Sequence, residues 1–206
     1  ARLGGFDPYS NSKACAELAI SSYRNSFFPV ARISEHQQAI ASARSGNVIG
    51  GGDWSENRLV PDIARALLQN KPVTIRNPKA VRPWQHVLDP LNGYLMLAAQ
   101  LAEYPQQHAT GYNFGPHPND ERTVEDMVKL SIEKWGSGSF EAPAMGQQPH
   151  EAGLLKLDIS KAQSALGWSP KFTSEEAVTW TMDWYKQSDG DVVALCQKQI
   201  SDFFDL

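Results

Sequence analysis

Residues 7–13, with the sequence DPYSNSK, open the first helix of the chain, and the rest of the sequence is interpreted around them. Asp7 is a favourable N-cap residue, and Pro8 suits the first helical position because its missing N–H would have no partner there. Apolar residues then recur at helical spacing. This pattern predicts a long helix that ends at Phe27 or Phe28.

Tyr9 and Lys13 are four positions apart in this helix, so both project from one face about one turn apart. A nearby ammonium stabilises a phenolate, which brings a tyrosine pKa down from about 10 toward the working range of a general base. A solvated helix face is the alternative, and it is the commoner meaning of a lone Tyr/Lys pair. The pair is a candidate catalytic site, and the rest of the sequence decides between this interpretation and a solvated helix face.

The composition is that of an ordinary soluble globular protein with a sizeable core. The 206 residues are 41% hydrophobic and 20% charged, and a net charge of −4 gives no reason to expect nucleic-acid binding. Cys15 and Cys196 lie far apart without metal-ligand spacing, so we expect a reducing, cytoplasmic compartment and no metal site. No apolar run approaches the roughly 18 residues of a membrane span. Residues 1–5 lack an initiator Met and a signal sequence, so the chain is expected to be part of something longer.

Hydrophobic period and turn residues predict alternating strands and helices after the first helix. A loop is expected at 29–37, and strands or extended segments are expected at 39–44, 72–75, 84–88, 111–115 and 154–158, the first of them buried. Helices are expected at 57–70, 89–103, 123–135, 160–167, 173–187 and from about 191 onward. The inward face of the helix at 89–103 is expected to consist of Leu91, Leu95, Ala98 and Leu101. This alternation indicates an α/β protein.

Local signals add detail at particular positions. Thr123 and Thr173 each begin a capping-box pattern, and Ser160 is expected to cap a short helix. The three glycines at 50–52 free the backbone for unusual dihedral angles, but a flexible surface loop is the simpler interpretation. They are not a dinucleotide fingerprint, because no G-x-G-x-x-G occurs in the chain.

The string DPYSNSKACAEL resembles the Tyr-x-x-x-Lys signature of the extended short-chain dehydrogenase/reductases, which act on nucleotide sugars with a bound nicotinamide cofactor. Further strings match the later part of that family in order: Arg44-x-x-Asn47, RPWQHVLD at 82–89, YNFG at 112–115 and LGWSP at 166–170. Within the family, SYRNSFF, GNVIGGGDW, IRNP, RPWQHV and PHEA with LKLD resemble the CDP-glucose 4,6-dehydratases. The chain departs from that pattern at Gly153 and Leu154, where His and Tyr are expected.

The resemblance implies roles for particular residues. Tyr9 would be the catalytic base, and Lys13 would stabilise its phenolate and hold the nicotinamide ribose, so both are catalytic and cofactor-binding candidates. Ser45 would lie beside the nicotinamide amide. The candidate substrate-binding residues are Asn47, Arg58, Arg82, Asn113 and His150.

These substrate-binding assignments have alternatives of different weight. Asn47 and Arg82 are expected to hold a diphosphate, to which a guanidinium donates paired hydrogen bonds. For Arg58, a diphosphate or sugar contact and a solvated side chain are equally open. Asn113 could instead satisfy backbone groups in a buried strand. His86 is interpreted as a satisfied core histidine and not as a catalyst.

The resemblance also implies a fold and an activity. Residues 1–48 and 89–115 would be the second half of a Rossmann-type domain with a parallel sheet, and residues 49–88 and 116–206 a smaller, mainly helical nucleotide-sugar-binding lobe. The implied enzyme is an NAD-dependent lyase that dehydrates CDP-glucose to CDP-4-keto-6-deoxyglucose, a step of dideoxyhexose and O-antigen biosynthesis. The glycine-rich turn that cradles the cofactor pyrophosphate is absent, so these residues alone are expected to be inactive.

Two other functions stay open at this point. The parent protein could be another nucleotide-sugar epimerase or dehydratase, or the chain could be a non-catalytic binding or dimerisation module. In the family the first helix packs against its counterpart in a second subunit, so a homodimer is expected. Tyr23 and Phe27 could instead cover the chain's own core. Neither a nucleic acid nor a membrane is expected as a partner.

Overall fold

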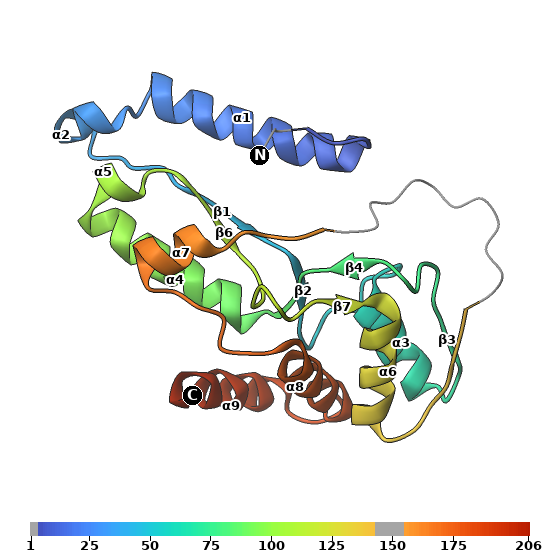
Figure 1. The fold of residues 1–206 in the computed structure, drawn as a ribbon. Coiled ribbons are helices and arrows are strands. Elements are labelled where there is room, and N and C mark those ends of the chain that lie inside the picture. Colours follow the sequence, from blue (N-terminus) through green and yellow to red (C-terminus); the bar gives the residue numbers. More distant parts are fainter. Residues whose placement is uncertain (1–3, 143–154) are drawn as a thin grey trace.

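The structure, a computed structural model, describes residues 4–142 and 155–206 and has the α/β architecture that the sequence predicts (Figure 1). Among these residues, the parallel strand pairs are β1 (Ser42–Ser45) with β6 (Gly111–Phe114), β2 (Asn47–Ile49) with β5 (Trp84–His86), and β3 (Val73–Thr74) with β8 (Phe140–Glu141). β4 (Val81–Arg82) pairs antiparallel with β7 (Arg122–Thr123). The parallel pairing between helices confirms the expected fold class.

Helices surround these strands on several sides. In chain order they are α1 (Pro8–Ser26), the 3-10 helix η1 (Val30–Arg32), α2 (Ile33–His36), α3 (Leu59–Leu68), α4 (Leu88–Glu103), α5 (Pro105–His108), α6 (Val124–Trp135), α7 (Ser160–Leu166), α8 (Ser174–Lys186) and α9 (Val192–Asp205). Within the described ranges, no helix combines the length and the apolar character needed to cross a membrane.

Capping residues fix the starts of several helices. Thr123 and Thr173 form capping boxes at the starts of α6 and α8, and Asp7 is the N-cap of α1, as the sequence predicts. Asp7 and Ser10 also complete a capping box, which the sequence analysis did not predict. Ser160 is not a cap. It is the first residue of α7, and its backbone N–H donates to the Asp158 carboxylate at 2.9 Å, so the preceding acidic side chain takes that role.

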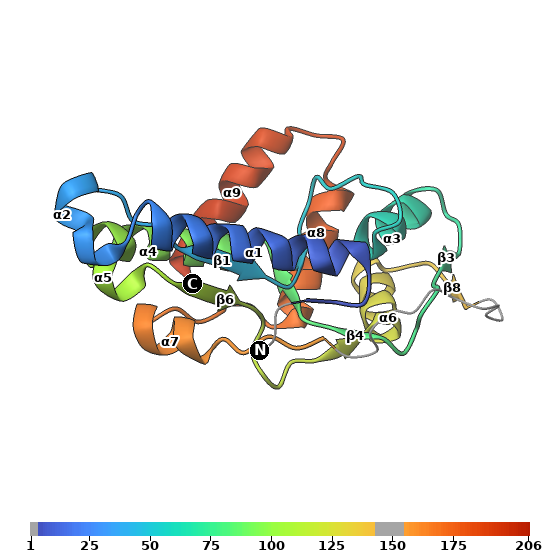
Figure 2. The same cartoon turned by 90° about the horizontal axis from the view of Figure 1, so that it is seen from above.

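The β1–β6 pair lies between α1 on one side and α4 on the other (Figures 1 and 2). Tyr112 and Phe114 of β6 are buried in a core with Leu97 of α4 and Trp168. Gly93 allows α4 to come close, because a Cβ there would lie 2.4 Å from the Phe114 ring. Since side chains alternate along a strand, Asn113, which lies between these two aromatic residues, points toward α1.

A larger core lies where α3, α6, α8 and α9 meet β2, β3 and β5. Its fully buried members include Ile63 of α3, Met127 of α6, Met182 of α8 and Phe203 of α9. This core positions the Gly-rich loop and the start of α3. The expected division into a Rossmann half and a substrate lobe at 49–88 and 116–206 stays a prediction.

Three predicted segments differ from the structure. Residues 29–37 are not a plain loop, since η1 and α2 lie there, and both are too short for periodicity to reveal. β1 is present but not buried as predicted, because only Ser42 of its residues is buried. Residues 155–158 form no strand, although the Leu155 N–H donates to the Val81 carbonyl at 3.3 Å. Leu154 lies outside the described residues.

The predicted inward face of α4 is wrong. Leu91 and Leu95 are 46% and 65% exposed, whereas the buried residues are Asp89, Pro90, Gly93 and Leu97. Apolar residues cover most of this helix, so the period alone does not decide which face is inward. The close approach at Gly93 decides it, and the true face is displaced by one residue.

Candidate active site

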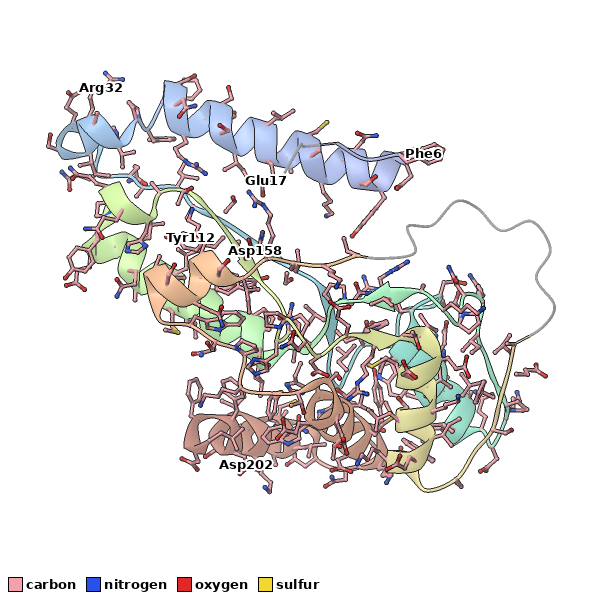
Figure 3. All side chains as sticks on the ribbon, in the orientation of Figure 1. Phe6, Glu17, Arg32, Tyr112, Asp158 and Asp202 are labelled. Carbon is pink, nitrogen blue, oxygen red and sulfur yellow. The ribbon has the colours of Figure 1, made fainter. Side chains whose placement is uncertain are left out.

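The first turn of α1 holds the candidate catalytic pair in a hydrogen-bonded frame. The Asp7 carboxylate accepts the Ser10 backbone N–H at 3.0 Å, and this bond lowers the pKa of Asp7 below its ordinary value. The Asn11 amide donates to the Gly5 carbonyl at 2.7 Å and accepts the Gly5 N–H at 3.2 Å. The residues before the helix are therefore folded back onto it, while Phe6 points away from the body of the protein (Figure 3).

Tyr9 and Lys13 lie together on one face of α1, as their spacing predicts. The Lys13 ammonium lies 5.4 Å from the centre of the Tyr9 ring, within the range of a cation–π contact. Both side chains are exposed, Tyr9 at 73%. The pair is thus assembled in advance, and its phenol and ammonium are accessible to a ligand.

Glu17, one turn after Lys13, attaches α1 to the sheet. Arg44 donates from Nε and Nη2 to the Glu17 carboxylate at 2.8 and 2.6 Å, and the Ser42 hydroxyl donates at 3.0 Å. The bonds from Arg44 lower the pKa of Glu17. Figure 3 shows Glu17 on the side of α1 that faces the strands. Tyr9, Lys13 and Glu17 follow one another at four-residue steps, so Lys13 lies about 40° and Tyr9 about 80° around the helix from Glu17.

The register of β2 and β5 brings Asn47 and Arg82 close together. Asn47 is the partner of Trp84, and its backbone N–H donates to the Pro83 carbonyl at 3.0 Å. Arg82 is only 8% exposed, and its Nη1 donates to the Val81 carbonyl at 2.8 Å. The backbones of Asn47 and of the residue after Arg82 are therefore hydrogen-bonded neighbours, although the two residues are 35 positions apart in the sequence. Joint binding of a diphosphate by their side chains stays a prediction.

Asn113 and Ser45 lie on opposite faces of the β1–β6 pair. Asn113 accepts from Arg44 Nη1 at 3.2 Å and donates to the Asp158 carbonyl at 3.1 Å, so it has the backbone-satisfying role that was the alternative for it. Ser45 is the partner of Phe114, so its side chain points to the other face. Contacts of Asn113 with substrate and of Ser45 with a cofactor stay predictions.

Arg58 is the N-cap residue of α3, and its side chain turns toward the Gly-rich loop. Its Nη1 lies 3.3 Å from the Asp53 carboxylate. Burial raises the pKa of Asp53, but hydrogen bonds from Ser55 and the charge of Arg58 outweigh burial and lower it overall. The Arg58 side chain does not cap α3, and Pro61 has no N–H, so the first turn offers an anion the backbone N–H groups of Leu59 and Val60. Arg76 joins this cluster by donating to Asn57 Oδ1 at 2.6 Å.

The Gly-rich loop is packed against the protein, so its interpretation as a flexible loop is wrong. A Cβ on Gly51 would lie 1.9 Å from the Trp184 ring, and one on Gly50 would lie 2.8 Å from Val87. Gly52 has a φ of +84°, a conformation that glycine adopts without strain. Only glycine permits this approach of the loop to α8.

Two buried titratable residues lie where β5 meets α4. His86 is 1% exposed and makes edge contacts with the rings of Phe172 and Trp180, and burial lowers its pKa to about 4. It is a core residue as predicted, although its Nε2 has no hydrogen-bond partner within the described part of the chain. Burial raises the pKa of Asp89 to about 6, even though its carboxylate accepts the Lys171 N–H at 2.7 Å.

Sequence reasoning missed the anchoring role of Glu17 and Arg44 and the pairing of Asp53 with Arg58. A signal for the first was present, because Glu17 continues the four-residue spacing of Tyr9 and Lys13. His150 lies outside the described residues. Within the described ranges, no group of three or more His, Cys, Asp or Glu side chains could hold a metal ion.

The sequence profile of the GDP-mannose 4,6 dehydratase family matches residues 2–181. The chain belongs to this family. It is 46% identical over 203 residues to the CDP-glucose 4,6-dehydratase of Salmonella typhimurium, an alignment that covers 98% of this chain and 56% of the relative. This similarity confirms the resemblance identified from the motifs.

Solved structures of nucleotide-sugar enzymes share the fold. A dTDP-glucose 4,6-dehydratase from Bacillus anthracis, in complex with NAD, superimposes with a TM-score of 0.71 at 21% identity over 94% of this chain and 57% of its own. A UDP-glucuronic acid 4-epimerase from Bacillus cereus, in complex with UDP-glucuronic acid and NAD, gives 0.71 at 20% identity over 88% of this chain and 53% of its own. The fold therefore does not separate dehydratases from epimerases, and this chain spans just over half the length of these relatives.

Proposed function

We propose that the full-length protein is an NAD-dependent lyase that dehydrates CDP-glucose to CDP-4-keto-6-deoxyglucose. The observation that carries the proposal is the preassembled Tyr9–Lys13 pair at the start of α1. Membership of a dehydratase family supports the reaction type. The preference for CDP rests on similarity to one relative, because no described residue can be identified as reading the base.

The residues present fit the nicotinamide end of a dinucleotide. Tyr9 and Lys13 offer an exposed phenol and an exposed ammonium. Both groups can donate hydrogen bonds to the hydroxyl oxygens of a ribose. The 206 residues contain no glycine-rich fingerprint for the pyrophosphate, so we assign NAD binding to the full-length protein. When bound, NAD supplies a hydride acceptor at C4 of the sugar and a hydride donor at C6.

Tyr9 is the residue placed to work at the C4 hydroxyl of the sugar. Its phenolate oxygen would take the hydroxyl proton while the C4 carbonyl forms, and the Lys13 ammonium would stabilise the phenolate. The C4 carbonyl makes the C5 proton acidic, which allows water to leave across C5 and C6. We assign the groups that move the C5 proton and the C6 hydroxyl to no residue of this chain.

Asn47, Arg82 and Arg58 are the proposed diphosphate-binding residues. The hydrogen bond from the Asn47 N–H to the Pro83 carbonyl, next to Arg82, supports a shared site for the first two, and Arg58 adds a second guanidinium at the start of α3. A diphosphate carries several acceptor oxygens, which suits two guanidinium groups and the N–H groups of a helix N-terminus. The proposal therefore divides the site into a catalytic end on α1 and a phosphate end on β2, β4 and α3.

Replacing Tyr9 tests the catalytic end. In the full-length protein, Tyr9→Phe is expected to reduce turnover of CDP-glucose by at least about 100-fold while substrate binding is retained, because only the acid–base hydroxyl is lost. Tyr23→Phe is the matched control, since Tyr23 is on the same helix and also exposed, at 58%. Near-normal turnover in Tyr9→Phe would show that another group is the base.

A homodimer through α1 is part of the proposal. Within the described structure α1 has no buried residue, and Leu18, Tyr23 and Phe27 are 57%, 58% and 62% exposed. These side chains do not cover the core of the described part of the chain, which supports a covering subunit instead. Light scattering of the full-length protein at micromolar concentration is expected to give a dimer mass, and a clean monomer mass would contradict the dimer.

A further inference from the structure

We propose that Tyr185, on α8, is a positioning residue for Arg58, which it orients through Asp53. The inference rests on the proposed role of Arg58 in holding the substrate diphosphate. Tyr185 is more than 120 residues from Arg58 in the sequence and would not touch the substrate itself. Its hydroxyl instead fixes the piece of backbone that carries the acidic partner of Arg58.

The contact between Tyr185 and the Gly-rich loop is short and buried. The Tyr185 hydroxyl donates to the Asp53 carbonyl at 2.5 Å, and the Tyr185 side chain is fully buried. Burial raises the pKa of Tyr185 to about 12, so its hydroxyl keeps its proton and remains a donor at every pH near neutrality. The backbone of Asp53 is therefore held to α8 by a hydrogen bond that water does not compete for.

The side chain of the same residue then receives Arg58. The Asp53 carboxylate accepts the Ser55 N–H at 2.9 Å and lies 3.3 Å from Arg58 Nη1. The Arg58 side chain is 67% exposed, and an exposed ion pair holds a long side chain only weakly. Fixing Asp53 at both its carbonyl and its carboxylate reduces the freedom that this pair would otherwise have.

Aromatic packing reinforces the attachment on both sides. Gly51 lies against Trp184, where no side chain would fit, and the Trp54 ring meets the Tyr185 ring edge-on at 5.0 Å. Two consecutive residues of α8, Trp184 and Tyr185, therefore pack against the loop. Arg58, five residues after Asp53, extends from this fixed loop toward solvent, where a diphosphate can reach it.

Removing the single hydroxyl tests the inference. In the full-length protein, Tyr185→Phe is expected to raise the KM for CDP-glucose by about three- to tenfold, the range that loss of one hydrogen bond gives, and to change kcat by less than about twofold. Tyr112→Phe is the matched control, because it removes a buried hydroxyl that lies 2.9 Å from His108 in the other core cluster. Tyr112→Phe is expected to leave KM unchanged.

A double-mutant cycle with Arg58→Ala tests the role of Arg58 in substrate binding separately from the action of Tyr185 through Arg58. If Tyr185 acts through Arg58, Arg58→Ala raises KM and adding Tyr185→Phe raises it no further. A raised KM in Arg58→Ala with an unchanged KM in Tyr185→Phe would overturn the inference and leave the proposed function intact. An unchanged KM in Arg58→Ala would overturn the role of Arg58 in substrate binding and the inference with it. An equal rise in KM on Tyr185→Phe in both backgrounds would show that Tyr185 acts independently of Arg58 and would overturn the inference.

Discussion

The Glu17 carboxylate and the Arg44 guanidinium form a two-point ion pair, with N–O distances of 2.8 and 2.6 Å, that joins α1 to β1. Within the described structure α1 buries no residue, so its position over the sheet depends on this pair more than on apolar packing. The same helix carries Lys13 one turn and Tyr9 two turns before Glu17. The ion pair therefore determines where the candidate catalytic residues stand relative to the strands.

Weakening this pair should loosen α1. Glu17→Gln keeps the shape of the side chain but removes its charge, and we expect amide hydrogen exchange in α1 to become about fivefold faster, as loss of about 1 kcal/mol implies. Glu35→Gln is the control, because Glu35 forms an exposed 3.7 Å ion pair with Arg32 elsewhere. The pKa of Glu17 is lowered in the folded protein, so its contribution is present above the ordinary value of 4.5 and is lost as pH falls below that value. Equal exchange in both variants would contradict the anchoring role.

Gly111 allows this pair to form. A Cβ at Gly111 would lie 2.3 Å from Arg44 Nη2, which the existing side-chain position does not allow. Gly111→Ala should therefore displace the guanidinium and speed hydrogen exchange in α1 to a similar extent as Glu17→Gln. Gly190→Ala is the matched control, since the nearest atom to its added Cβ would be at an ordinary distance of 3.4 Å. Unchanged protection of α1 in Gly111→Ala would show that the arginine can rearrange without loss.

His86 and Asp89 should give the stability two opposing pH dependences. Asp89 has a pKa of about 6 in the folded protein and an ordinary value of 3.8, so the folded state binds this proton more tightly and gains stability as pH falls through that range. His86 has a pKa of about 4 and an ordinary value of 6.5, so the folded state loses stability as pH falls between those values. In the wild type the two effects partly cancel.

Single substitutions should separate these effects. As pH falls from about 6.5 to 4, Asp89→Asn is expected to lose stability relative to the wild type, by on the order of 2 kcal/mol, while His86→Gln gains relative to it. Urea denaturation of each variant at several pH values measures both slopes. Parallel pH profiles for all three proteins would show that burial does not shift these groups.

Much of the fold could be predicted from local signals, and most of the failures have one physical origin. Asp7, Thr123 and Thr173 mark helix starts because capping involves neighbouring residues only. The inward face of α4 could not be predicted, because Gly93 and its contact with Phe114 decide it. The pairing of Glu17 with Arg44, 27 residues apart, likewise depends on how two elements meet.

The candidate site also contains some features that local sequence predicts and others that depend on contacts between distant residues. The Tyr9–Lys13 pair follows from helical spacing, and the motif order led to Asn47 and Arg82. The hydrogen bond from the Asn47 N–H to the Pro83 carbonyl then makes Asn47 a neighbour of the residue after Arg82. The attachment of Asp53 to Tyr185 could not be predicted, because no local pattern connects residues 132 positions apart. Positioning interactions of this kind come only from the folded structure.

Arg82 provides a test of the phosphate end. Arg82→Lys keeps the charge but loses the planar fork that binds two oxygens, so we expect the KM for CDP-glucose to rise about tenfold with a smaller change in kcat. Arg122→Lys is the control, because Arg122 is the strand partner of Arg82 and its Nε donates to the Ser174 hydroxyl at 3.1 Å. A KM that is unchanged in Arg82→Lys would remove Arg82 from the diphosphate site.

The most direct test of the central claim is the product that the full-length protein makes from CDP-glucose. With deuterium at C4 of the sugar, we predict a product lighter by one water, with a carbonyl at C4 and the deuterium at C6. Mass spectrometry and NMR report both changes in one reaction. A product of unchanged mass with inverted C4 would instead identify an epimerase, and water loss from dTDP-glucose or UDP-glucose but not from CDP-glucose would contradict the proposed substrate.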